Sequence, residues 1–277
     1  MATISKNDSA GFREVVGEVM SKVPAVTLGF WLIKILATTL GETAGDSVTM
    51  TWLGETTSAA NPNGYLIGTG LFLAIFMAFV ALQIAAKKFH AYLYWATIAA
   101  STTAGTTMAD YATRSLGIGY AGGSLLLFAS VIACLALWYR SLGTISVDTV
   151  NSPKAEGFYW ATITFSQTLG TALGDWMADT GGFGYGGSAF IFSAALVIIA
   201  VAYFSTNISR VGLFWAAFIL TRPLGATVGD FLDKPLDHGG LALSRPLATL
   251  VIAVIMIACI VTIPQRAGRH PAPKPAT

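Results

Sequence analysis

Long apolar stretches dominate the chain and alternate with short polar or glycine-rich segments. A helix that crosses a bilayer needs about 20 mostly apolar residues. Eight such stretches can be drawn, at approximately residues 24–45, 65–86, 91–110, 119–140, 157–176, 186–206, 211–230 and 243–263. The pattern predicts an all-α membrane protein with about eight transmembrane helices.

The eight stretches form a single transmembrane domain, residues 24–263, between two polar ends. The N-terminal segment, residues 1–23, is expected to be cytoplasmic, with a helical part over residues 6–22. Its first apolar stretch comes too late for the core of a cleavable signal peptide. The C-terminal segment, residues 264–277, is rich in Pro and basic residues and is expected to be a disordered cytoplasmic tail.

The basic residues predict the orientation in the membrane, because cytoplasmic loops carry an excess of Lys and Arg. Eleven of them fall on the side of the two termini: Lys6, Arg13, Lys22, Lys87, Lys88, Arg140, Lys154, Arg210, Arg266, Arg269 and Lys274. Three fall in the opposite loops: Arg114, Lys234 and Arg245. We therefore expect a multi-pass protein of the bacterial inner membrane with both termini in the cytoplasm.

Four segments of the chain align with one another without a gap, at residues 30–46, 94–110, 159–175 and 214–230. An aromatic residue and a Trp open each segment, a Gly follows ten residues after the Trp, and an Asp follows fifteen residues after it. The glycines are Gly41, Gly105, Gly170 and Gly225, and the aspartates are Asp46, Asp110, Asp175 and Asp230. Chance does not produce four such matches.

Each aligned segment is followed by a glycine-rich loop and a second apolar stretch. The chain therefore divides into four parallel two-helix repeats, at about residues 24–86, 91–140, 157–206 and 211–263. Because each repeat contains two spans, all four run in the same direction around an axis near the membrane normal.

Small and hydroxylated residues surround the repeated glycines, among them Thr39, Thr103 and Thr168. Two interpretations stay open. Gly, Ser and Thr allow transmembrane helices to pack closely. Alternatively, the helices bend at the glycines, and the hydroxyls line a central path, an interpretation that Pro223 favours in the fourth copy.

The repeated acids suggest a binding site. A carboxylate in hydrocarbon costs at least about 2.5 kcal/mol unless it faces a cavity or a partner. Four parallel repeats would bring the four repeated aspartates to one depth, where Glu42 of the first copy could join them as a metal ligand. The alternative is that the aspartates only cap helix ends in the outer loops.

Two basic residues lie inside predicted spans: Lys34 in the first copy and Arg222 in the fourth. A lone intramembrane cation usually pairs with an acid on a neighbouring helix. We expect Lys34 and Arg222 to form ion pairs or to gate a path. Their proposed acidic partners are drawn from Glu42, Asp46, Asp110, Asp175 and Asp179. The alternative is that these pairs only lock the bundle.

Composition excludes several functions. Only 11% of the residues are charged and 54% are hydrophobic, and a net charge of +2 does not suggest nucleic acid as a partner. Cys134 and Cys259 lie in separate apolar stretches, so a zinc or iron–sulfur site has no support. The sequence carries no hydrolase, metalloprotease or phosphate-binding motif, and we do not expect an enzyme.

The segment Glu42-Thr43-Ala44-Gly45-Asp46 and the recurring Gly/Ala-Asp resemble bacterial membrane proteins built from a tandem repeat of unknown function. The resemblance covers about residues 31–263 and implies an integral membrane fold without an assigned activity. A looser similarity is to multi-repeat divalent-cation exporters with Glu-x-Gly-Asp motifs. This chain has an extra residue between Glu42 and Gly45 and has the Glu in the first copy only.

These observations favour a proton-coupled transporter, an antiporter or exporter, for a small cation. Carboxylates and hydroxyls suit hard divalent ions such as Mn²⁺ or Mg²⁺. The site would lie between two halves, repeats one–two and three–four, and no cofactor is expected apart from the ion as substrate. The alternatives are a membrane sensor or structural protein with static ion pairs, and an anion or small-solute transporter that uses Arg222. A homodimer is compatible with a bundle of this size.

Overall fold

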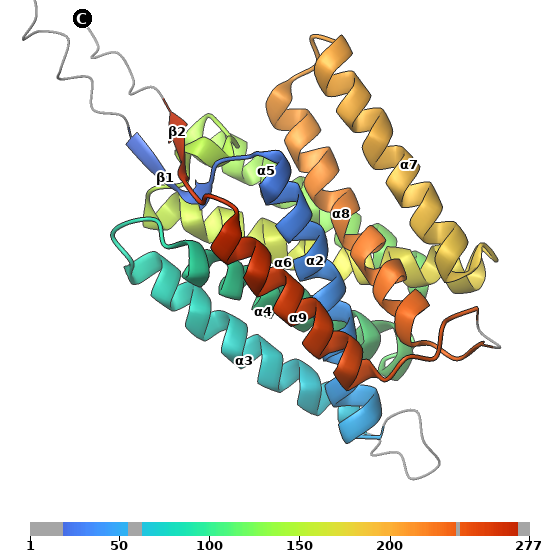
Figure 1. Cartoon of the computed structure of the whole chain (residues 1–277). Helices are drawn as coiled ribbons and strands as arrows, with labels where there is room; N and C mark the ends of the chain where they lie inside the picture. Colours follow the sequence, from blue (N-terminus) through green and yellow to red (C-terminus); the bar gives the residue numbers. More distant parts are fainter. Residues whose placement is uncertain (1–18, 55–62, 237–238, 271–277) are drawn as a thin grey trace, which may run out of the picture.

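The computed structural model describes residues 19–54, 63–236 and 239–270 (Figure 1). Within these ranges the chain is all-α apart from one two-stranded sheet. Eight long α-helices are described: α2 Leu28–Asp46, α3 Gly64–Ala85, α4 Ala91–Asp110, α5 Tyr120–Leu142, α6 Pro153–Asp175, α7 Gly184–Ser205, α8 Arg210–Asp233 and α9 Arg245–Thr262. Each coincides with one of the eight apolar stretches, so the all-α fold predicted from the sequence is confirmed.

The first helices of the repeats form an inner ring, in which α2, α4, α6 and α8 each pack against two others. The second helices lie outside this ring. Helix α3 packs on α4, α5 on α6, α7 on α8, and α9 returns to pack on α2. The second helix of a repeat thus packs mainly on the first helix of the next repeat. The expected two-helix hairpin is a unit of sequence, while the packing links successive repeats into a closed circle.

Glycines bring the inner helices into close contact. A side-chain carbon built at Gly41 would lie 2.8 Å from the backbone carbonyl carbon of Thr102 on α4. The same close approach recurs at Gly105 to α6, at Gly170 to α8 and at Gly225 to α2. All four helices run through these glycines, and α8 also continues through Pro223. The inner helices are therefore not interrupted at the glycines, and the close approaches support the first of the two interpretations, close helix packing.

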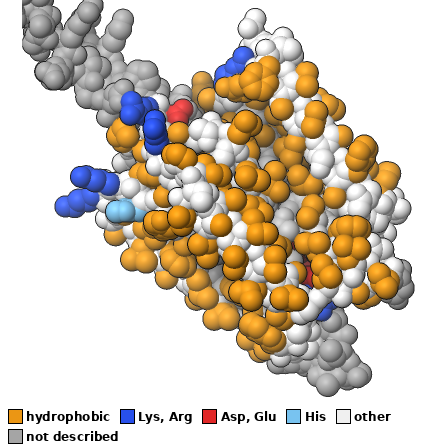
Figure 2. Space-filling model, in the orientation of Figure 1, with side chains coloured by type: hydrophobic (Ala, Val, Ile, Leu, Met, Phe, Trp, Pro, Cys, Tyr) orange, Lys and Arg blue, Asp and Glu red, His pale blue; other side chains and the backbone are white. Residues whose placement is uncertain are grey.

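Polarity is distributed inside out compared with a water-soluble protein. The inner helices bury many hydroxyl and charged side chains, whereas large apolar side chains are exposed on the outer helices. Figure 2 shows hydrophobic side chains over most of the visible face, with most visible Lys and Arg side chains near one end. Five described helices are long and apolar enough to cross a membrane: α3, α5, α7, α8 and α9. A water-soluble monomer rarely exposes so much contiguous apolar surface, so the fold suggests a membrane protein.

The ends of the described chain are joined at the end of the bundle where α2 begins (Figure 1). Strand β1, Val19–Pro24, pairs antiparallel with β2, Ala267–His270. The expectation of a disordered tail is therefore wrong for the part that forms β2, because backbone pairing orders it. The helix expected over residues 6–22 is also wrong at its end, where β1 begins, and its earlier part lies outside the described residues.

Candidate functional site

Every fourth residue of the inner helices faces the centre of the bundle, since positions four apart share one face of a helix. These residues form five layers along the axis of the bundle, which we call the axial stack. The layers are numbered from the end where the inner helices begin. Layer one is Phe30, Tyr94, Tyr159 and Phe214; layer two is Lys34, Ile98, Ile163 and Phe218; layer three is Thr38, Thr102, Gln167 and Arg222; layer four is Glu42, Thr106, Thr171 and Ala226; layer five is Asp46, Asp110, Asp175 and Asp230. All twenty residues are buried. The axis is thus aromatic at one end and acidic at the other.

Layer four is held together by one guanidinium. Nη2 of Arg222 donates to Oε2 of Glu42 at 2.8 Å and to Oγ1 of Thr106 at 2.6 Å, and it also donates to Oγ1 of Thr171. The two threonine hydroxyls each donate to the same Glu42 oxygen at 3.3 Å. Arg222 therefore joins all four inner helices, and it does pair with Glu42, one of the acids expected from the sequence.

The four aspartates of layer five lie inside the bundle, each at most 2% exposed. Asp46, Asp110 and Asp175 end their α-helices, yet their side chains make no capping hydrogen bond to the π-helical turns that follow. These turns are η1 Ser47–Trp52, η2 Tyr111–Ser115 and η4 Trp176–Thr180. The alternative of acids that cap helix ends in outer loops does not fit this placement.

Two basic residues from the ends of the inner helices pair with these aspartates. Nζ of Lys234 lies 2.6 Å from Oδ2 of Asp46 and 2.9 Å from Oδ1 of Asp230. Arg114 lies with Nε 3.0 Å from Oδ1 of Asp110 and with Nη2 3.2 Å from Oδ2 of Asp175. The ion pairs thus join repeat four to repeat one and repeat two to repeat three. They cross the division into repeats one–two and three–four that the sequence suggested.

Arg114 and Lys234 were expected in the outer loops, and no pairing with the aspartates was predicted for them. Arg114 follows Asp110 by four residues, and Lys234 follows Asp230 by four. This spacing places an acid and a base on one face of a helix. The two ion pairs within a helix end could therefore have been predicted from the sequence.

Three carboxylates form a candidate metal site. Glu42, Asp46 and Asp230 each offer an oxygen atom, and these three atoms lie within 4.8 Å of one another. Oxygen ligands of this kind suit a hard divalent cation. Asp110 and Asp175 do not belong to this cluster. The carboxylates of the cluster are bound by Lys234 and Arg222, so three negative and two positive charges leave one net negative charge.

Lys34 has no acidic partner among the described residues, so the ion pair expected for it is wrong. Its side chain is fully buried, its Nζ has no hydrogen-bond partner, and the ammonium lies 4.2 Å from the ring centroid of Phe218. Lys34 lies eight residues before Glu42, a separation of about 12 Å along the helix. Within the described part of the chain, the amide of Gln167 and the Nε and Nη1 atoms of Arg222 are also without hydrogen-bond partners.

The threonines predicted to line a path do not face the axis. The hydroxyls of Thr39, Thr103 and Thr168 donate to carbonyl oxygens of their own helices, at 3.1, 2.9 and 3.0 Å. Such bonds satisfy a hydroxyl within one helix turn. The axial position is the preceding residue of each repeat, in layer three. Asp179, another expected partner of the buried cations, accepts a hydrogen bond from the Tyr185 hydroxyl at 3.1 Å.

Comparison with known families agrees with the fourfold division of the chain. A family model described as Repeat of Unknown Function (DUF347) matches residues 29–89, 93–144, 158–209 and 213–263. Each match covers most of one inner helix and the whole of the outer helix that follows it. No curated protein and no solved structure matches the chain.

Proposed function

We propose that this chain, which belongs to the DUF347 family of repeats of unknown function, is a membrane transporter for a small cation. The observation that carries the proposal is the cluster of Glu42, Asp46 and Asp230, three buried carboxylates within reach of one ion. A divalent metal such as Mn²⁺ is the favoured substrate, and coupling to protons is part of the proposal.

In this proposal all eight helices cross the membrane. The inner helices are less apolar than the outer ones because they bury polar side chains inside the ring, where the outer helices shield them from lipid. Helix α2, with 19 residues, is about 28 Å long, close to the hydrocarbon thickness of about 30 Å. The excess of basic residues on the side of the termini supports a location in the bacterial inner membrane with both termini in the cytoplasm, which is part of the proposal.

Lys234 acts as an internal substitute for the substrate. Its ammonium lies between Asp46 and Asp230, where a metal ion would bind. A lysine is a compact charge on a flexible chain, so it can leave the carboxylates when a cation arrives and return when the cation departs. Protons that bind the carboxylates after the ion departs would couple the two fluxes.

The opposite side of layer five has different chemistry. Asp110 and Asp175 share the planar guanidinium of Arg114, and a guanidinium holds carboxylates in a fixed geometry. We therefore assign Asp110 and Asp175 a structural role and place the ion on the side of Lys234. The two sides provide a matched pair of variants, Asp46→Asn and Asp110→Asn. Each variant replaces one carboxylate of layer five, paired with a basic side chain, by a neutral amide.

The test compares thermal stability with and without Mn²⁺ or Mg²⁺, and ion uptake into proteoliposomes. A ligand at 100 times its dissociation constant stabilises a protein by about 2.7 kcal/mol. Such stabilisation and a metal flux are expected for wild type and Asp110→Asn, and both should disappear in Asp46→Asn. Equal responses of the two variants would remove the cluster from the site.

The second candidate function is that of a non-transporting membrane protein, because each of the four aspartates of layer five already forms an ion pair with a basic side chain. In that case the ion pairs only stabilise the bundle. Neither variant nor wild type would then respond to any cation or to a pH gradient, which separates this function from transport.

A further inference from the structure

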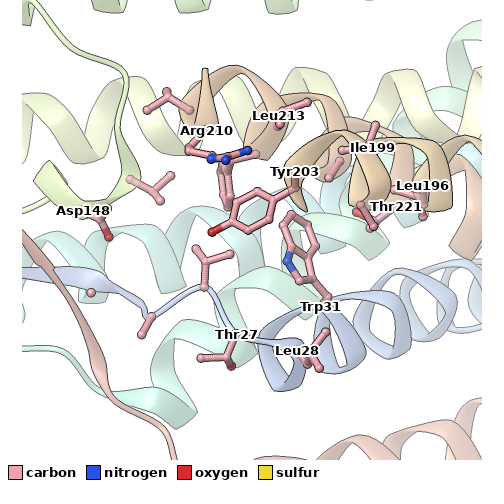
Figure 3. A pocket seen from close by; sticks show the side chains of 18 of the residues that line it. Thr27, Leu28, Trp31, Asp148, Leu196, Ile199, Tyr203, Arg210, Leu213 and Thr221 are labelled. Atoms are coloured by element: carbon pink, nitrogen blue, oxygen red, sulfur yellow. The ribbon is translucent and has the colours of Figure 1, made fainter. Parts of the chain in front are cut away.

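A cavity of about 660 Å³ opens between α2, α7 and α8, outside the inner ring (Figure 3). Trp31, Leu196 and Tyr203 contribute to its mostly apolar lining. The cavity extends along α8 from Arg210 to Thr221. Its size is in the range of about 300–1,000 Å³ that is typical of small-molecule sites.

The cavity lies where the fourfold pattern of the bundle is broken. In two other repeats an outer helix covers the repeated Trp of an inner helix. Phe76 of α3 lies over Trp160, with ring centroids 6.3 Å apart, and Trp138 of α5 lies over Trp215 at 5.7 Å. These two inner tryptophans and Trp95 are at most 4% exposed.

Helix α7 does not cover Trp31 in this way, and Trp31 is only partly buried. When α3, α5 and α7 are aligned at their shared Gly-Tyr, Leu196 of α7 takes the position of Phe76, and Tyr203 takes the position of Trp138. Tyr203 is 46% exposed, and the Cζ of Arg210 lies 4.5 Å from its ring centroid. Leu196 thus stands where α3 has the aromatic Phe76, and the ring of Tyr203 lies against Arg210, so a cavity remains beside Trp31.

The dimensions of the cavity match one leaflet of a bilayer. From Arg210 to Thr221 the helix rises about 16 Å, and half of the hydrocarbon core is about 15 Å. The end of the cavity at Arg210, which we take as its mouth, lies at the end of the bundle that is rich in basic residues. Its charged residues are Arg210, Arg269 and Asp148, with a net charge of +1 from two positive charges and one negative.

We propose that this cavity binds one anionic phospholipid, with an acyl chain against Trp31 and the phosphate beside Arg210. An apolar slot of leaflet depth with a basic mouth suits a lipid better than a water-soluble ligand. Basic residues at the membrane surface attract anionic headgroups. The inference rests on the proposed membrane location of the chain and is independent of the carboxylate cluster.

The first test measures which lipids the full-length protein retains after extraction from nanodiscs with equal amounts of phosphatidylglycerol and phosphatidylcholine. Native mass spectrometry should find one retained lipid, with phosphatidylglycerol preferred about fivefold, an effect expected from one basic residue. Arg210→Gln should bring the preference close to one. Arg140→Gln is the control, because Arg140 is exposed at the same end of the bundle on α5. Equal effects of the two variants would overturn the proposal.

The second test uses fluorescence quenching by phosphatidylglycerol with brominated acyl chains. Trp31→Phe should remove a large part of the quenching, whereas Trp95→Phe should not, because Trp95 is fully buried at the equivalent position. Unchanged quenching in Trp31→Phe would contradict an acyl chain in the cavity. A protein that does not insert into nanodiscs at all would instead overturn the membrane location, and with it the proposed transport function.

Discussion

The buried ion pair between Arg222 and Glu42 provides a quantitative test of how the bundle is held together. Both side chains lie on the axis, at 0% and 3% exposure, and Arg222 is the only charged group bound to Glu42 among the described residues. In Arg222→Gln the carboxylate would keep only two threonine hydroxyls, at 3.3 Å. Removing one partner of a buried pair destabilises a protein by about 3–5 kcal/mol. We expect a loss of this size.

The assay is denaturant unfolding in detergent, followed by circular dichroism, for wild type, Arg222→Gln, Glu42→Gln and the double variant. Each single variant leaves one buried charge without its partner, whereas the double variant leaves none. The double variant should therefore be more stable than the sum of the single losses predicts, by about 0.5–3 kcal/mol for groups in contact. A loss below about 1 kcal/mol in Arg222→Gln, or additive effects in the cycle, would refute the ion pair.

Two further predictions concern the inner ring and use the same unfolding assay. Gly41→Ala should destabilise by about 1–3 kcal/mol because its new side chain would meet the backbone of Thr102. Gly70→Ala, with nothing within 4 Å, should instead gain up to about 1 kcal/mol of helix propensity, and equal effects would contradict the close packing. Lys34→Met should stabilise by about 1–3 kcal/mol, because it replaces a buried polar group that has no hydrogen-bond partner. Destabilisation by Lys34→Met would mean that the ammonium has a partner.

The repeats and the eight helices could be predicted because both depend on local sequence patterns. The recurring Trp, Gly and Asp reveal the repeats, and the length of the apolar stretches reveals the helices. The order of packing could not. Hydropathy identifies α3 as a strongly apolar helix, but it does not say that α3 packs mainly on α4, which belongs to the next repeat. The polarity of α2, α4 and α6 was the available clue, since helices that bury polar residues must be shielded from lipid.

The acids of the site were predicted more successfully than their partners. Repetition singles out Asp46 and its equivalents, whereas Lys234 and Arg114 occur once each and lie just beyond the spans drawn from hydropathy. Lys34 was expected to reach an acid because it lies inside a span. Its separation from Glu42, about 12 Å along the helix, prevents that contact, and the spacing of eight residues already implied it.

Fourfold repetition imposes a physical problem that the differences between the repeats solve. Identical repeats would bring four aspartates to one depth in a medium of low dielectric, where like charges repel strongly. Lys234 and Arg114 divide the ring into two pairs of acids, each with one cation. In layer four, Ala226 takes the place held by Glu42, Thr106 and Thr171 in the other repeats, and the small side chain leaves room for Arg222 to extend from the layer before. Glu42 of the carboxylate cluster, its buried ion pair with Arg222 and the cavity beside Trp31 all occur at positions where one repeat departs from the others. Restoring at Glu42 the threonine of repeats two and three would leave Arg222 buried without its acidic partner, so we expect this substitution to reduce stability as well as any cation binding.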